Sequence, residues 1–154
     1  MSKFKIVALG GTFDIIHKGH HALLQKGFSI SSQVIIGLTS DEFAIKKGKN
    51  LLHNYSQRLE SLQSFLNKNF PNSHYEISKL DNDFGPAVLR KEVEALVVSE
   101  ETIEKGEILN KLRSQKDLLP VSVESVPMVL AKDGKRISTT RIKNSEVDTD
   151  GNLC

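Results

Sequence analysis

The residues best suited to chemistry lie in one stretch, Gly10 to His20, which contains two adjacent glycines, a threonine and two histidines. Gly10 and Gly11 follow an apolar run and let the backbone approach a ligand closely. A helix is predicted to begin near Gly19, so its free N–H groups and its positive dipole end should face the same crevice. Thr12 offers a hydroxyl, and His20 can donate a hydrogen bond to a phosphate oxygen. The stretch therefore predicts phosphate binding.

Two other interpretations of this stretch are open. The glycines could form an ordinary turn before a helix whose early histidines are merely exposed. Alternatively, His17 and His21 have the i,i+4 spacing of metal ligands. His17 lies ahead of the predicted helix, however, and no third Cys, His or Glu stands at a ligand spacing, so we predict no metal site. The stretch has neither the G-x-G-x-x-G of dinucleotide-binding proteins nor the G-K-[ST] of a P-loop, which disfavours both classes.

Charged side chains elsewhere in the chain could complete a phosphate site. The run 46–49, Lys-Lys-Gly-Lys, has the composition of a solvated loop, but Lys46 or Lys47 could bind the phosphate of a second substrate. Arg58 is either a surface residue or part of the same cluster. We expect Asp14 to brace the glycine turn rather than to act as a base. Three histidines without an evident partner are predicted at the surface: His21, His53 and His74.

The elements that must position these residues alternate between apolar runs and helical patterns, which is typical of a parallel α/β sheet. Asn54 and Gln57 have the spacing of a capping box, which predicts the start of a helix there. Five strands joined by helices predict a doubly wound, Rossmann-like sheet with its ligands at the carboxyl ends of the strands. The predicted strands are 3–9, 33–38, 75–77, 94–98 and 121–126, and the predicted helices are 19–30, 41–45, 55–70, 103–112 and 138–143.

Length and composition are those of a globular protein. The 154 residues predict a single domain over residues 1–154, with 38% hydrophobic and 26% charged residues. A net charge of +2 is too small for a nucleic-acid-binding surface. The single cysteine, Cys154, cannot form an intrachain disulfide. The sequence shows neither a membrane-spanning run nor a signal-peptide pattern, so we expect a soluble, cytoplasmic protein without a membrane partner.

Two signatures resemble those of the nucleotidylyltransferase superfamily. Residues 12–14, Thr-Phe-Asp, followed by His17-x-Gly19-His20, resemble its T/HxGH motif, and Ile137-Ser-Thr-Thr-Arg141 resembles its second, ISST-R type motif. The two together are more specific than either alone. Further segments at 37–42, 55–59, 97–102 and 133–135 are similar to the archaeal-type phosphopantetheine adenylyltransferases, so the resemblance covers nearly the whole chain.

The resemblance implies transfer of AMP from ATP to 4′-phosphopantetheine, giving dephospho-CoA and pyrophosphate in coenzyme A synthesis. It implies that His20 contacts the α-phosphate, that Thr12 lies beside the reacting phosphate, and that Mg²⁺ is held mainly by ATP oxygens and water. The residues it implies for catalysis are His20, Thr12, Lys46, Lys47 and Arg141. Those it implies for nucleotide binding are Gly10, Gly11, Thr12, Phe13, His17, His20, Ser99, Glu100, Ile137, Ser138, Thr139 and Arg141.

The chain departs from the bacterial members of this family at one loop. Where they carry an arginine-rich segment after the fourth strand, this chain has Ser-Glu-Glu-Thr at 99–102, which we expect near adenine or ribose. Two alternatives stay open: the same chemistry on another acceptor, such as nicotinamide mononucleotide with ATP or glycerol 3-phosphate with CTP, and a nucleotide-binding module without turnover. We expect a monomer or a small homo-oligomer.

Overall fold

The fold is a five-stranded parallel sheet with the strand order β3-β2-β1-β4-β5, which confirms the predicted doubly wound architecture. The computed structural model describes residues 3–88, 90–127, 129–135, 137, 141–142 and 144–153. No helix in these ranges is both long and apolar enough to cross a bilayer. The strands are β1 (Phe4–Gly11), β2 (Ser31–Thr39), β3 (Tyr75–Leu80), β4 (Val93–Ser99) and β5 (Ser122–Val126). The helices are α1 (Lys18–Ile30), α2 (Asp41–Lys46), α3 (Tyr55–Asn69) and α4 (Glu104–Gln115), with 3-10 turns η1 (Gly85–Val88) and η2 (Glu100–Thr102).

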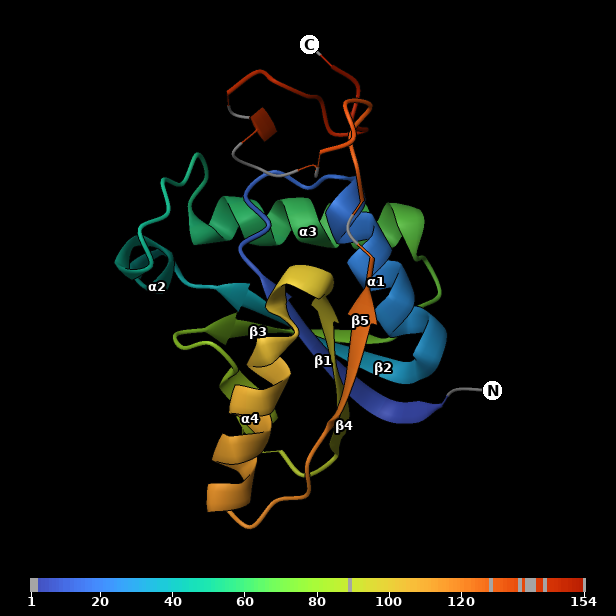
Figure 1. The fold of residues 1–154 in the computed structure, drawn as a ribbon, viewed down its shortest axis with the longest axis vertical. Helices are drawn as coiled ribbons and strands as arrows, with labels where there is room; N and C mark the ends of the chain where they lie inside the picture. The colour runs from blue at the N-terminus through green and yellow to red at the C-terminus, as the bar shows by residue number, and fades with distance from the viewer. Residues whose placement is uncertain are drawn as a thin grey trace.

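Helices cover both faces of the sheet, which explains why its strands are nearly continuous apolar runs. Val7 and Leu9 of β1 point to one face and pack in a core with side chains from α1 and α3. Ala8, between them in sequence, points to the other face and packs in a second core with Leu109 of α4. Figure 1 shows α1 and α3 together on one side of the sheet and α4 on the other. The chain after β5 lies beyond the tips of the strands, at the top of that view.

One boundary corrects the sequence prediction. The first strand does not end at Leu9, because Gly10 and Gly11 continue β1 and pair with Gly37 and Leu38 of β2. Ladder pairing with a neighbouring strand holds these glycines in an extended form that their own propensity does not favour. The sharp turn therefore begins only after Gly11, which places the signature residues directly at the sheet edge. The predicted final helix at 138–143 lies partly outside the described residues.

Two buried arginines join the elements at their ends. Arg58 of α3 is 1% exposed and donates to the carbonyls of Thr12 and Thr39 at 2.9 and 2.8 Å. Its other groups donate to the carbonyl of His53 and to the carboxylate of Asp41. Arg58 was predicted either at the surface or in a phosphate cluster, and it is in neither place. Arg113 of α4 is equally buried and donates to carbonyls only, those of Ala87, Arg90, Val93 and Leu119.

Replacing Arg58 should destabilise the fold strongly. Arg58→Met keeps much of the volume but leaves Asp41 and three carbonyls without their donor, which should lower the free energy of unfolding by about 3–5 kcal/mol. The measurement is urea unfolding followed by circular dichroism. Lys68→Met, an exposed change near the end of the same helix, should cost less than about 0.5 kcal/mol. A similar small cost for Arg58→Met would contradict this account.

Candidate active site

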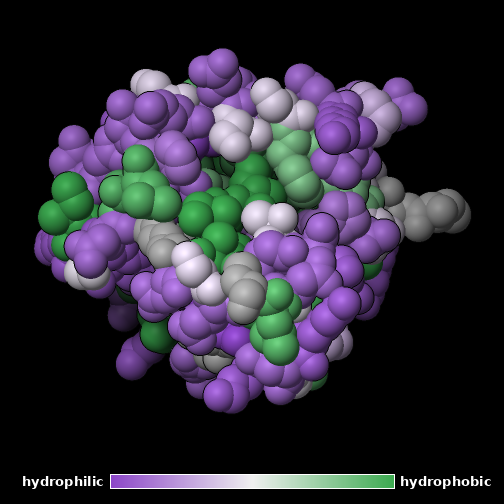
Figure 2. Space-filling model, turned by 90° about the horizontal axis from the view of Figure 1, so that it is seen from above, coloured by the Kyte–Doolittle hydropathy of each residue, from purple (hydrophilic) through white to green (hydrophobic). Residues whose placement is uncertain are grey.

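A cleft opens at the carboxyl ends of β1, β2 and β4, where the direction of the crossovers reverses between β1 and β4. Its volume of about 670 Å³ is within the range of ~300–1,000 Å³ typical of small-molecule sites. Figure 2 looks onto this end of the molecule and shows a hollow with a hydrophobic floor and a largely hydrophilic rim. Eight of the residues predicted to bind nucleotide line the cleft: Gly10, Gly11, Thr12, Phe13, His17, His20, Ser99 and Ile137.

The turn after β1 is held in an unusual conformation. Phe13 is 1% exposed and has a φ of 51°, a left-handed value that is unfavourable for a residue with a large side chain. Its ring packs against that of His20, with 4.7 Å between ring centroids. Because the buried Phe13 side chain fixes the turn, it also fixes one side of the His20 imidazole. Such local strain is typical of functional sites.

His17 and His20 cap α1 reciprocally. His17 is the N-cap residue, and its Nδ1 accepts the N–H of Gly19 at 3.0 Å. In return, the N–H of His17 donates to Nδ1 of His20 at 3.2 Å, and the two rings stack with centroids 4.0 Å apart. This is the geometry of a capping box, with imidazoles in place of the usual hydroxyl and carboxylate. The T/HxGH signature is therefore also a helix-start signal.

The prediction that free N–H groups of α1 face an anion is wrong. The N–H of Lys18 donates to the carbonyl of Thr149 at 3.0 Å, and those of Gly19 and His20 donate to the side chain of His17. These amides at the start of α1 are therefore bonded within the protein. The helix dipole still favours negative charge at this end. The first three amides of α1 therefore do not supply the contacts to an anion.

The capping bonds determine which atoms of the histidines can supply those contacts. Because Nδ1 of each ring accepts an N–H, the proton of each neutral imidazole is on Nε2, which is thereby a donor. Burial lowers the pKa of His17 to about 4. Burial also lowers the pKa of His20 to about 3, assisted by the charges of His17 and Lys49. Both histidines are thus neutral hydrogen-bond donors near neutral pH.

A lysine that the sequence analysis did not single out, Lys49, is close enough to His20 for its charge to affect the pKa of that histidine. Lys49 lines the cleft, and its charge contributes to the low pKa of His20. Lys46, in the last turn of α2, is exposed and does not line the cleft, and its contact with a second substrate stays a prediction. Lys47 lines the cleft and pairs with Asp83 at 2.9 Å. The signal that could have found Lys49 is Gly48, whose turn reverses the chain after α2.

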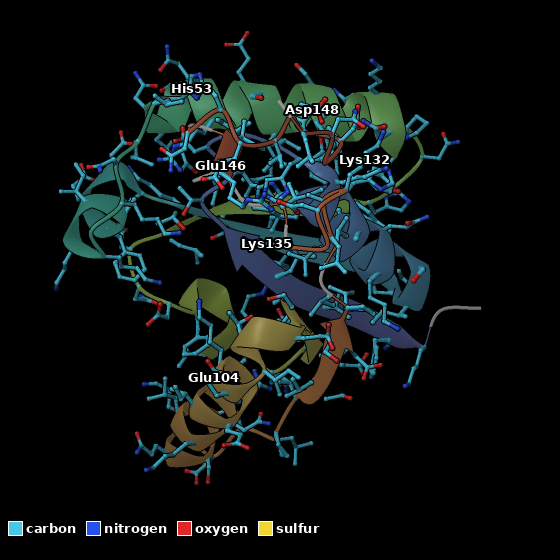
Figure 3. The ribbon with its side chains drawn as sticks, turned by 45° about the horizontal axis from the view of Figure 1, so that its top comes forward. His53, Glu104, Lys132, Lys135, Glu146 and Asp148 are labelled. Carbon is cyan, nitrogen blue, oxygen red and sulfur yellow. The ribbon has the colours of Figure 1, made fainter. Side chains whose placement is uncertain are left out.

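The opposite side of the cleft carries a second charged group. Lys105, in the first turn of α4, lines the cleft and lies close enough to Lys47 and Asp83 for their charges to affect its pKa, which is lowered mainly by burial. Figure 3 shows His53 just before α3 and Glu104 at the start of α4, on opposite sides of the sheet. The cleft is lined by Leu23 of α1 and by Lys105 of α4, helices that cover opposite faces of the sheet. Sequence reasoning did not single out Asp83 or Lys105.

The loop 99–102, which was predicted to lie near adenine or ribose, reaches the cleft only in part. Ser99 and Thr102 line it, and their hydroxyls are 3.2 Å apart. Glu100 is exposed in η2 and is not among the lining residues, so its contact with the nucleotide stays a prediction. The apolar side chains of Val126, the last residue of β5, and of Val129, after that strand, line the cleft as well. This end of the cleft offers hydroxyls and apolar surface, as a nucleoside requires.

The second signature lies in the segment after β5, which has a small core of its own formed by Ala131, Ile137 and Val147. Ile137 also lines the cleft. Arg141 does not line it, because its guanidinium bonds to the carboxylates of Asp133 and Glu146. The predicted role of Arg141 in binding phosphate stays a prediction. The predicted ligands Ser138 and Thr139 lie outside the described residues.

Two of the histidines predicted at the surface have partners. Nδ1 of His53 lies 3.1 Å from the carboxylate of Asp14, and the ring of His21 packs against those of Phe65 and Phe70. Asp14 also accepts the N–H groups of Leu52 and His53, so it braces the glycine turn against a distant segment.

In the described part of the chain, no group of three or more His, Cys, Asp or Glu side chains is arranged to hold a metal ion.

Comparison with known proteins identifies relatives over most of the chain. The family model of cytidylyltransferase-like proteins matches residues 8–145. A phosphopantetheine adenylyltransferase from Methanothermobacter thermautotrophicus is 38% identical over 151 residues, which cover 98% of this chain and 90% of the relative. One from Pyrococcus horikoshii is 40% identical, with 99% and 96% of the two chains covered. A crystal structure of an Archaeoglobus fulgidus protein of unknown function superposes with a TM-score of 0.70 at 28% identity, covering 80% of this chain and 89% of that one.

The low pKa values of the two histidines predict how stability depends on pH. Unfolding returns both groups to a pKa near 6.5, so between pH 6.5 and about 4 the unfolded state binds more protons than the folded state. The contribution of the two neutral histidines to stability is therefore fully present above pH 6.5, and the free energy of unfolding falls as the pH decreases through this window.

Urea unfolding at pH 7.5 and pH 5.0 tests this dependence. His20→Gln keeps an acceptor for the N–H of His17 and should reduce the loss between the two pH values by about 1–2 kcal/mol. His74→Gln, a change at an exposed histidine, is the matched control and should leave the loss as in the wild type. An unchanged loss in His20→Gln would show that His20 is not buried as a neutral group.

Proposed function

Because the chain belongs to the cytidylyltransferase-like family, and specifically to the group of phosphopantetheine adenylyltransferases, we propose that it transfers AMP from ATP to 4′-phosphopantetheine. The products are dephospho-CoA and pyrophosphate, in the synthesis of coenzyme A. The observation that carries this proposal is the pair of Nε2–H donors of His17 and His20 beside Lys49, in a cleft at the switch point of the sheet. A phosphoryl group in transfer is stabilised by several hydrogen-bond donors and a positive charge placed together around it.

The proposed reaction is a direct in-line displacement at the α-phosphorus. An oxygen of the acceptor phosphate forms the new P–O bond as the bond to pyrophosphate breaks. A phosphomonoester has a second pKa of about 6 and is largely deprotonated at neutral pH, so the acceptor needs no strong base. The protein has to bring two anions together and stabilise the charge of the transferring group. His20 and Lys49 would do this at the α-phosphate, with Thr12 beside it.

The triphosphate needs further counter-charge. Mg²⁺ would be held by ATP oxygens and water, since the described residues offer no acidic cage for it. We assign Ser138, Thr139 and Arg141 to the departing pyrophosphate on the resemblance of their motif. Arg141 would then exchange its carboxylate partners, Asp133 and Glu146, for phosphate oxygens. The hydroxyls of the Ser99 loop would contact the nucleoside.

Pyrophosphate release with different acceptors tests the proposed function. Purified protein with ATP and Mg²⁺ should release pyrophosphate with 4′-phosphopantetheine and not with nicotinamide mononucleotide. CTP with glycerol 3-phosphate should also give none. Preference for one of these other acceptors would reassign the substrate. ATP binding in calorimetry without release with any acceptor would indicate a nucleotide-binding module instead.

The choice among the lysines is tested by separate substitutions. Lys49→Ala should lower kcat by roughly 10²-fold, the usual effect of losing one preorganised contact to the transition state. Lys46→Ala should stay within about 2-fold, because its side chain does not line the cleft. Lys68→Ala, on the exposed face of α3, controls for the loss of a surface charge. A larger loss for Lys46→Ala than for Lys49→Ala would restore the interpretation from the sequence.

A further inference from the structure

The carboxylate of Asp14 belongs to the first signature, but it faces the protein. Its side chain is 3% exposed. Oδ2 accepts the N–H of Leu52 at 2.9 Å, and Oδ1 accepts the N–H of His53 at 3.0 Å. Nδ1 of His53 lies 3.1 Å from the same Oδ1. Both oxygens of Asp14 therefore hold one end of the segment 49–53.

The other end of this segment is fixed by the termination of α2. The N–H of Gly48 donates to the carbonyl of Ile45 at 2.9 Å, and that of Lys49 donates to Ala44 at 3.0 Å. Gly48 has a φ of 81°. This pair of bonds around a left-handed glycine is a Schellman motif, which reverses the chain after a helix. Lys49 therefore leaves the helix in a defined direction.

Only two residues separate the two anchors. Asn50 and Leu51 lie between Lys49 and the amides that Asp14 holds, and both line the cleft together with Lys49. So short a connection limits how far its two ends can move relative to each other, because each residue spans at most ~3.3–3.6 Å. If the bonds from Asp14 were lost, the segment would keep the bond from Arg58 to the carbonyl of His53 but would lose the acceptors of the Leu52 and His53 amides. The backbone that carries Lys49 would then be less firmly placed in the cleft.

We propose that Asp14 is a positioning residue that acts through Lys49, by tethering the segment 49–53 so that the ammonium group stays beside His20 in the cleft. Its kinetic consequence rests on the proposed function. A carboxylate suits this task because it has two acceptor oxygens and no donor. Asn in its place would turn an NH₂ group toward a backbone N–H, which loses one bond and sets two donors against each other.

A direct role of Asp14 as general base makes a different prediction. A base would act on the acceptor whether or not Lys49 is present, and its loss would change the pH profile of kcat. A positioning residue loses its effect when the group it positions is removed. The two roles are therefore separated by a double-mutant cycle between Asp14 and Lys49.

The cycle uses Asp14→Asn, Lys49→Ala and the double variant, measured by pyrophosphate release and by calorimetry of ATP binding without an acceptor. Asp14→Asn should lower kcat/KM by about 10–100-fold in the wild-type background, the scale of a misplaced catalytic group. In the Lys49→Ala background its effect on kcat/KM and on ATP affinity should be at most about 2-fold. The loss should be constant from pH 6 to pH 9. Equal losses in both backgrounds, or a loss that varies with pH, would overturn the proposal.

Amide hydrogen exchange tests the tether without reference to turnover. In Asp14→Asn, the amides of Leu52 and His53 should exchange at least about 10-fold faster, while those of β1 and β2 stay protected. Asp81→Asn, an exposed aspartate after β3, should change neither exchange nor kinetics. Unchanged exchange at Leu52 and His53 would overturn the proposal even if turnover fell.

A milder variant covers the case in which Asp14→Asn does not fold. His53→Ala removes one of the three donors to Asp14 and should lower kcat/KM by about 2–5-fold, with no effect in the Lys49→Ala background. An equal effect of His53→Ala in both backgrounds would overturn the proposal. If the wild type releases no pyrophosphate with 4′-phosphopantetheine, the proposed function fails. The exchange experiment and the ATP-binding cycle then still decide the role of Asp14.

Discussion

The geometry of the cleft depends on the guanidinium of Arg58. The carbonyls of Thr12, just after β1, and of Thr39, the last residue of β2, lie where the sheet opens into the cleft. Arg58 donates to both, and its remaining nitrogens bond to His53 and Asp41. The glycine turn, the start of α2 and the start of α3 are thereby fixed against one another. A lysine has no planar fork and could not serve the same four acceptors.

This arrangement explains which parts of the structure could be predicted from the sequence. The strands, the helices and the capping box at Asn54 are local patterns, and the structure has them within a few residues. The roles of Arg58 and His53 are not local, since their partners lie up to 46 and 39 residues away. A single sequence gives no indication of such pairs. Lys49 was overlooked for a related reason, because composition alone does not distinguish the lysines of a basic run.

The start of α1 shows how a correct motif can be assigned an incorrect mechanism. The sequence analysis expected backbone amides of α1 to bind the anion, but those at its first residues are bonded to His17 and Thr149. The same bonds orient the histidines so that each presents Nε2–H. Because burial keeps both rings neutral, the site has no pair of buried cations whose charges would repel each other. It has preorganised neutral donors and obtains its charge from Lys49 at the border of the cleft.

The second signature is subject to a different constraint. Arg141 is already paired with Asp133 and Glu146, so the proposed contribution to ATP binding would be the difference in free energy between its bonds to phosphate oxygens and its bonds to these two carboxylates. That difference is smaller than the value of a charge-assisted bond to an unpaired arginine. The pairing joins Asp133, in the turn before the motif, to Glu146 beyond it, and Ile137 links their small core to the cleft. If Arg141 exchanged its carboxylate partners for phosphate oxygens, the segment after β5 would lose two of the ion pairs that hold it together. The net effect on the affinity for ATP would therefore depend on how the small core repacks. In this protein the first signature is therefore rigid before the nucleotide binds, whereas Arg141 of the second would contribute by exchanging the ion pairs that hold its own segment together.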